Sequence, residues 1–141
     1  MKIHLIDYLK SFLGTPYKWG GETPFGIDCS GLGQEFLRAV GIDPPGDQTA
    51  QGLYDYFLEA GKVSSMRAGA FVFYGSHSRS IIHVGIAIDD VLIVEAGGGD
   101  STVTTKESAE KKKAFVRMRP YNYRPDFITA SMPPYPEWVK L

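Results

Sequence analysis

The sequence predicts an α+β fold, in which helices of the first half pack against an antiparallel β-sheet formed by the second half. Up to about residue 60, apolar residues recur at spacings of three and four, as they do on one face of a helix. After residue 70 they gather in short β-branched runs separated by turn residues. The chain has 141 residues and no linker long enough to divide it, so residues 1–141 are expected to form a single domain.

Three helices are predicted in the first half, each bounded by a capping residue or by glycine and proline. A loop rich in glycine and proline, residues 14–27, separates the first two. The predicted helices cover residues 3–13, the segment from Asp28 to Gly41, and a segment capped by Asp47 that extends to about Ala60.

The strands are predicted from β-branched and aromatic runs. They cover residues 70–74, 81–88, 91–96 and 114–120, and a tight Asp89-Asp90 turn joins the second and third into a hairpin. Residues 104–113 are expected to form a short polar helix or a loop. The tail from Arg124 onward, rich in proline and aromatic residues, is expected to be irregular, either packed against the domain or reaching a partner.

Composition excludes several classes of protein. The net charge of -1 gives no overall field that would draw the chain to nucleic acid or to an anionic membrane. No apolar run approaches the roughly 18 residues of a membrane span. The N-terminal segment does not resemble a secretory signal. A single cysteine allows neither an internal disulfide nor a cysteine-rich zinc site, and no metal or cofactor is expected.

Cys29 is the first candidate for chemistry. Asp28 is a suitable N-cap, which places Cys29 in the first turn of the second helix. Unpaired backbone N–H groups and the positive end of the helix dipole favour a thiolate there. Ser30 and Gly31 are small and would let a substrate backbone approach. The same features would suit an inert buried cysteine, which is the more common role of a lone cysteine.

His83 favours the catalytic interpretation. It lies in the middle of an otherwise apolar strand, where a histidine needs a hydrogen-bond partner. Strand periodicity places Gly85 and Ala87 on the same face as His83. We expect these small residues to admit the start of the second helix and so bring Cys29 within reach of the imidazole. His4, in the first helical turn, and His77, in a polar loop, are weaker candidates.

Glu95 is the best-placed partner for the second nitrogen of His83. It follows Val91-Leu92-Ile93-Val94 in the predicted strand 91–96, where a carboxylate is costly unless it is paired. A tight turn centred near residue 89 would pair His83 with residue 95 or 96 of the neighbouring strand. The alternative is an ordinary glutamate at the end of a strand.

Four segments together resemble the NlpC-type cell-wall cysteine peptidases, a small papain-like family. The resemblance extends from residue 5 to about residue 96. The four segments are Gly14-Thr15-Pro16-Tyr17-Lys18-Trp19-Gly20-Gly21, Ile27-Asp28-Cys29-Ser30-Gly31-Leu32, Arg67-Ala68-Gly69-Ala70-Phe71-Val72-Phe73 and His83-Val84-Gly85-Ile86.

The resemblance implies a hydrolase that cuts the γ-D-glutamyl bond to the diamino acid of peptidoglycan stem peptides. It implies that Cys29 is the nucleophile, that His83 is the general base and that Tyr17 helps to form the oxyanion hole. It also implies that Asp28 and Ser30 contact the stem peptide, and we expect Trp19 to bind substrate beside them. The family commonly has His, Asn or Gln where this chain has Glu95.

Other functions remain open at this point. An N-acetylmuramoyl-L-alanine amidase would use the same machinery in a different groove. A non-catalytic wall-binding component of a phage particle would use the cleft only to dock. Related lipid acyltransferases are disfavoured, because their histidine precedes their cysteine in the chain. Without an export signal or wall-anchoring repeats, the sequence favours a phage-associated enzyme that acts on the cell wall, delivered by the phage or released at lysis.

Overall fold

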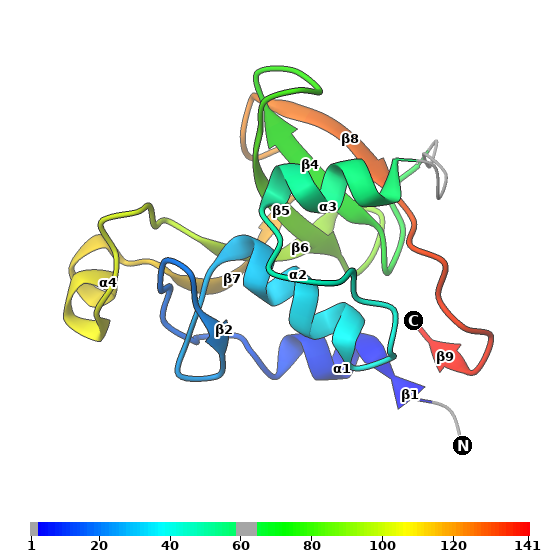
Figure 1. Cartoon of the computed structure of the whole chain (residues 1–141), viewed down its shortest axis with the longest axis horizontal. Helices are drawn as coiled ribbons and strands as arrows, with labels where there is room; N and C mark the ends of the chain where they lie inside the picture. The colour runs from blue at the N-terminus through cyan, green and yellow to red at the C-terminus, as the bar shows by residue number, and fades with distance from the viewer. Residues whose placement is uncertain (1–2, 59–64) are drawn as a thin grey trace.

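The computed structural model describes residues 3–58 and 65–141. Three helices, α1, α2 and α3, precede the main sheet in the chain, and α4 lies at the far end of the molecule from the two termini (Figure 1). The helices are α1 (Leu5–Lys10), α2 (Cys29–Arg38), α3 (Ala50–Phe57) and α4 (Lys106–Lys112). A short antiparallel pair, β2 (Glu22–Thr23) and β3 (Gly26–Ile27), lies in the loop before α2.

The main sheet has five antiparallel strands in the order β7-β6-β5-β4-β8. Its strands are β4 (Phe71–Gly75), β5 (Ile81–Ala87), β6 (Leu92–Gly97), β7 (Phe115–Pro120) and β8 (Phe127–Ser131). The predicted α+β fold is confirmed, and β4 to β7 lie within about a residue of the segments expected from the sequence.

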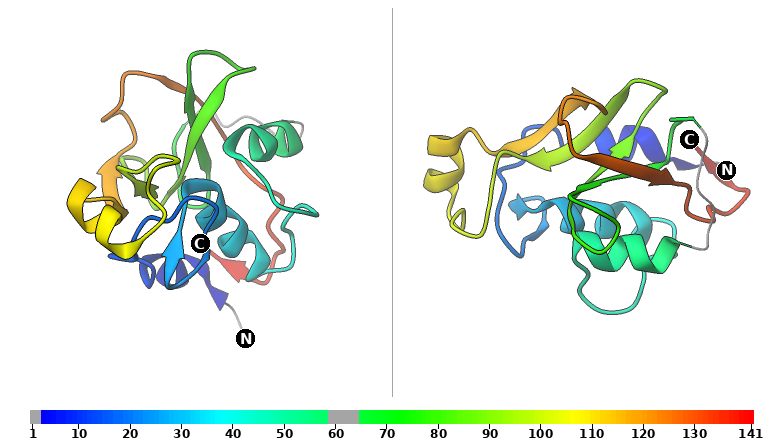
Figure 2. Two further views of the ribbon diagram at one scale, coloured as in Figure 1. Left: turned by 60° about the vertical axis from the view of Figure 1, so that its left-hand side comes forward. Right: turned by 90° about the horizontal axis from the view of Figure 1, so that it is seen from above.

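Both faces of the sheet contribute to apolar packing. On one face, Phe71, Val84 and Val94 pack with Leu32 of α2 and Leu53 of α3 in the main core. Helices α2 and α3 lie side by side against this side of the sheet (Figure 2). The other face carries a smaller cluster formed by Ala70, Val72, Tyr74, Ala87, Ile93 and Ala130. The central strands β4, β5 and β6 are therefore buried on both faces over most of their length.

The prediction of an irregular tail from residue 124 is wrong in two places. Residues 127–131 form β8, which pairs with β4 at the edge of the sheet. Val139–Lys140 form β9, which runs parallel to β1 (Ile3–His4) and brings the two ends of the chain together (Figure 1). Between them, the Tyr135 hydroxyl donates to the Gly69 carbonyl at 2.6 Å and its ring meets Phe36 edge-on at 6.0 Å.

Helix boundaries also differ from those expected. Helix α1 is shorter than residues 3–13, because β1 precedes it and a turn follows Lys10. The cap of α3 is Thr49 rather than Asp47, since the Thr49 side chain accepts from the Gly52 N–H. The expected end of that helix at Ala60 lies outside the described residues. Residues 106–112 do form a helix, which a Thr105–Ser108 capping box begins.

Candidate active site

A cleft of about 860 Å³ opens where the start of α2 faces the start of β5. It is large enough for a peptide-sized ligand. Its walls come from the loop before α2, the residues before α3, the loop after β6 and the segment that follows β7. The side chains that line it include Tyr17, Trp19, Asp28, Cys29, Ser30, His83, Arg117, Tyr123 and Arg124.

Cys29 is the first residue of α2, as the sequence predicts, and it is partly exposed in the cleft. The Asp28 carboxylate caps the helix by accepting from the Gly31 N–H at 2.7 Å, and it also accepts from the Gly20 N–H at 2.8 Å. Asp28 therefore ties the glycine-rich loop to the helix start. Gly31 is required in this arrangement, because a Cβ there would lie 2.1 Å from the Gly21 carbonyl oxygen.

His83 lies on β5 with only 7% of its surface exposed. Its Nε2 atom is 2.7 Å from Glu95 Oε1, so Nδ1 is the nitrogen that remains available to Cys29. Burial alone would lower the pKa of His83, but hydrogen bonding and charge from Cys29 and Glu95 outweigh burial and raise it. The structure thus brings together the three residues proposed from the sequence as nucleophile, base and orienting group.

The prediction that Gly85 and Ala87 make room for the start of α2 is wrong. A Cβ on Gly85 would lie 2.7 Å from Ile93 Cδ1 and 3.5 Å from Glu95 Cβ, so the missing side chain makes room for β6 rather than for a helix. Ala87 belongs to the cluster on the face away from α2. Helix α2 instead packs its apolar side on the opposite face of the sheet, and its first turn extends to the cleft.

The expected pairing register of β5 with β6 is also wrong, although Glu95 does lie beside His83 as predicted. Ile86 pairs with Val94 and Ala87 with Ile93, a register that sets Glu95 opposite Gly85 and diagonal to His83. Side chains two residues apart on a strand share a face, so Glu95 still lies on the face of His83. The absence of a side chain at Gly85 leaves the carboxylate free to reach along the strand to the imidazole.

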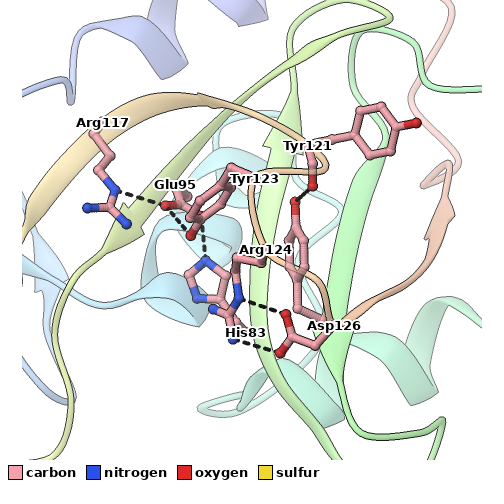
Figure 3. A network of polar contacts seen from close by, with 8 residues as sticks. His83, Glu95, Arg117, Tyr121, Tyr123, Arg124 and Asp126 are labelled. Carbon is pink, nitrogen blue, oxygen red and sulfur yellow. Dashed lines mark hydrogen bonds and ion pairs between the residues drawn. The ribbon is translucent and has the colours of Figure 1, made fainter.

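Glu95 is fully buried and its carboxylate is saturated with donors. Besides His83, it accepts from Arg117 Nε at 2.9 Å and from the Tyr123 hydroxyl at 2.8 and 2.7 Å (Figure 3). Burial alone would raise the pKa of Glu95, but these partners hold it below its usual value. The sequence did not single out Arg117 or Tyr123, and only the pairing of β6 with β7 could have revealed Arg117.

Tyr17 is buried and lies beside Cys29 at the cleft. Burial, followed by the charges of Cys29, Asp28 and Asp100, raises the pKa of its phenol, so the hydroxyl keeps its proton and can donate it. Within the described residues that hydroxyl makes no hydrogen bond. Gly99 packs directly on the ring, because a Cβ there would lie 2.2 Å from Tyr17 Cδ1.

The residues expected to contact substrate differ in how freely they can do so. The Asp28 carboxylate already serves two backbone N–H groups, and the Ser30 hydroxyl donates to it at 3.3 Å. Burial raises the pKa of Asp28, although the hydrogen bonds oppose that effect. Trp19 is 54% exposed and offers an uncovered ring to the cleft. Within the described residues, no group of His, Cys, Asp and Glu could hold a metal ion.

Comparison with known proteins identifies the family of this chain and supports its fold. Residues 14–119 match the NlpC/P60 family. The chain belongs to the NlpC/P60 family. This NlpC/P60 chain has TM-scores of 0.71 and 0.67 to two solved structures, each 24% identical in sequence. The first is a family protein from Bacillus cereus, aligned over 94% of this chain and 39% of the other. The second is the NlpC/P60 domain of the peptidoglycan hydrolase SagA, aligned over 92% and 96%.

Two curated relatives of this NlpC/P60 chain come from Bacillus subtilis. The probable peptidoglycan endopeptidase LytE is 29% identical over 115 residues, which are 79% of this chain and 32% of LytE. The γ-D-glutamyl-L-lysine dipeptidyl-peptidase is 38% identical over 82 residues, which are 55% of this chain and 26% of that enzyme. The alignments thus span about a third or less of each relative's length. Among the described residues, no helix is long and apolar enough to cross a membrane.

Proposed function

We propose that this chain is a cysteine peptidase that hydrolyses peptidoglycan stem peptides at the γ-D-glutamyl bond to the diamino acid. One observation carries the proposal: a partly exposed cysteine at a helix start shares a cleft with a buried histidine whose far nitrogen is bound by a carboxylate. This order of groups is that of an activated nucleophile, its base and the group that orients the base.

The reaction would proceed through a thioester. The Cys29 thiolate attacks the γ-carbonyl carbon, and the resulting oxyanion accepts from the Tyr17 hydroxyl and from the Cys29 backbone N–H, which has no acceptor within the helix. As the C–N bond breaks, the protonated His83 gives its proton to the leaving amine. His83 then accepts a proton from the water that hydrolyses the thioester, and the thiolate and the imidazolium are restored.

Support for the substrate comes from the relatives and from the cleft. LytE is named as a probable peptidoglycan endopeptidase, and the dipeptidyl-peptidase is named for the γ-D-glutamyl-L-lysine bond. Trp19 exposes an aromatic face at one wall, and Asp28 and Ser30 lie beside the nucleophile. Association with a phage particle stays a prediction from the sequence.

Digestion of purified peptidoglycan, followed by mass spectrometry of the soluble products, tests this proposal. The wild-type chain should release fragments that end in D-glutamate, together with fragments that begin at the diamino acid. An amidase would instead release whole stem peptides that begin with L-alanine. Cys29→Ala should lower the rate of release by about 10⁴-fold or more, with an unchanged unfolding midpoint. Equal release by the folded Cys29→Ala variant would refute every catalytic role for Cys29.

A further inference from the structure

The carboxylate of Glu95 is unusual among the groups around His83, because it is charged and entirely removed from solvent. A buried carboxylate is costly unless it is both paired with a cation and hydrogen-bonded. The histidine alone does not meet this need throughout the proposed reaction, since His83 is neutral whenever it has given up its proton. At that stage a second cation must compensate Glu95.

Arg117 is that cation. It lies directly opposite Glu95 in the pairing of β6 with β7, and its Nε donates to Oε2 at 2.9 Å. The Tyr123 hydroxyl bridges both carboxylate oxygens, and the Arg117 guanidinium lies over the Tyr123 ring at 5.7 Å from its centre. Arg117 and Tyr123 thus hold the carboxylate in addition to the imidazole (Figure 3).

We propose that Arg117 and Tyr123 are positioning residues that hold the Glu95 carboxylate in line with His83 Nε2, and that Arg117 supplies the balancing charge that allows a glutamate to occupy this place. This inference rests on the proposed peptidase function, and it adds two residues that act through Glu95. With Arg117 present, the set of thiolate, imidazolium, carboxylate and guanidinium carries no net charge.

The charge balance gives each substitution a direction. Removing Arg117 takes a cation from the neighbourhood of His83, so the imidazolium is held more tightly and gives up its proton less readily. Removing the charge of Glu95 has the opposite effect and leaves the guanidinium unpaired. The titratable and charged groups that face His83 or its carboxylate from the surrounding elements are Cys29, Tyr74, Glu95, Arg117, Tyr123, Arg124 and Asp126.

The test compares Arg117→Met, Glu95→Gln and the double variant in the full chain. Arg119→Met is the matched control, because Arg119 lies two residues along the same strand, is exposed and, among the described residues, hydrogen-bonds only to the Met118 carbonyl. The His83 titration is followed by NMR in a Cys29→Ala background, since a neighbouring thiol would titrate together with the ring. The rate of muropeptide release is measured against pH with Cys29 intact.

Arg117→Met should raise the titration midpoint of His83 by about one pH unit, and Glu95→Gln should lower it. The double variant should fall between them. Near neutral pH, Arg117→Met should lower kcat/KM by about 10-fold or more, and the double variant should lose less than the two single losses multiplied. Arg119→Met should match the wild type in both measurements.

Two results would overturn the inference: an unchanged His83 midpoint in a folded Arg117→Met variant, or losses in the double variant that multiply. If Arg117→Met fails to fold, Tyr123→Phe provides the second route. It keeps the charge, so it should lower the rate with little shift of the midpoint, and an unchanged rate would contradict the role of Tyr123. Failure of the proposed function is separate, because it would appear as an inactive wild type while the NMR titrations still report on Arg117.

Discussion

Replacing Gly99 by alanine tests whether the Tyr17 ring is fixed where its hydroxyl can reach the oxyanion. A Cβ on Gly99 would lie 2.2, 2.5 and 2.6 Å from three atoms of that ring, whereas ordinary contact begins at 3.4 Å. The backbone of Gly99 is not in the left-handed region, so steric overlap is the main consequence of the substitution. Tyr17 must therefore recede by about 1 Å or more, and the hydroxyl moves with it.

A displacement of this size should lower both activity and stability. Loss of one oxyanion-hole donor lowers kcat by about 100- to 1,000-fold, and a misplacement of about 1 Å can have a similar effect. We therefore expect kcat of Gly99→Ala to fall by about 100-fold. Overpacking against the core should lower the free energy of unfolding by about 1–3 kcal/mol, which chemical denaturation measures.

A double-mutant cycle with Tyr17→Phe separates displacement of the hydroxyl from other damage. If the hydroxyl is what Gly99→Ala moves, adding that change to Tyr17→Phe should cost little further kcat. Thr104→Ala, an exposed position in the same connection between β6 and α4, is the control and should behave as wild type. Full activity of a folded Gly99→Ala variant, or losses that multiply in the cycle, would refute the role given to Tyr17.

Two further predictions concern the tail and the buried carboxylate. Tyr135→Ala should lower the free energy of unfolding by about 3 kcal/mol, because it removes packing on Phe36 and a hydrogen bond to Gly69, whereas the exposed Trp138→Ala should change it by about 0.5 kcal/mol or less. If both substitutions lowered the free energy of unfolding equally in urea denaturation, the result would contradict the packing of Tyr135 against Phe36. Hydrogen bonds hold the pKa of Glu95 below its usual value against the effect of burial, so its contribution to stability is present above about pH 4.3 and is lost as pH falls through the lowered pKa. The difference in free energy of unfolding between wild type and Glu95→Gln should therefore narrow from pH 7 to pH 3. A constant difference would contradict the predicted direction of this pH dependence.

The parts of the fold that were predicted correctly are those with local causes. Asp28 caps α2 through its own side chain, so the position of Cys29 follows from the neighbouring residues. The strands β4 to β7 follow from runs of β-branched and aromatic residues. In contrast, β8 is flanked by Pro125 and Pro133, and its regular backbone depends on pairing with β4 more than fifty residues earlier in the chain. Phe127-Ile128-Thr129 are strand-forming residues, but so short a run does not reveal this distant pairing.

The β5–β6 turn explains why a wrong register still produced the right partner for His83. Asp89 accepts from the N–H groups of Val91 and Leu92 at 2.8 and 2.7 Å, and the Ile88 N–H donates to the Leu92 carbonyl. This turn is centred at residue 90, one residue later than the centre near residue 89 assumed from the sequence. Moving the centre of a hairpin by one residue shifts the pairing by two, which keeps every side chain on its face.

The buried charge of Glu95 is also paired with a second cation, which the sequence alone did not reveal. A carboxylate in an apolar strand requires a partner, and His83 satisfied that requirement as far as the sequence showed. The structure shows a second partner, Arg117, on a strand that begins eighteen residues after β6 ends, held in place by the direct pairing of the two residues. A neutral group in place of Glu95 would need no such cation. The presence of the guanidinium is therefore best understood as a consequence of the glutamate, and the two positions should be changed together in any attempt to alter this site.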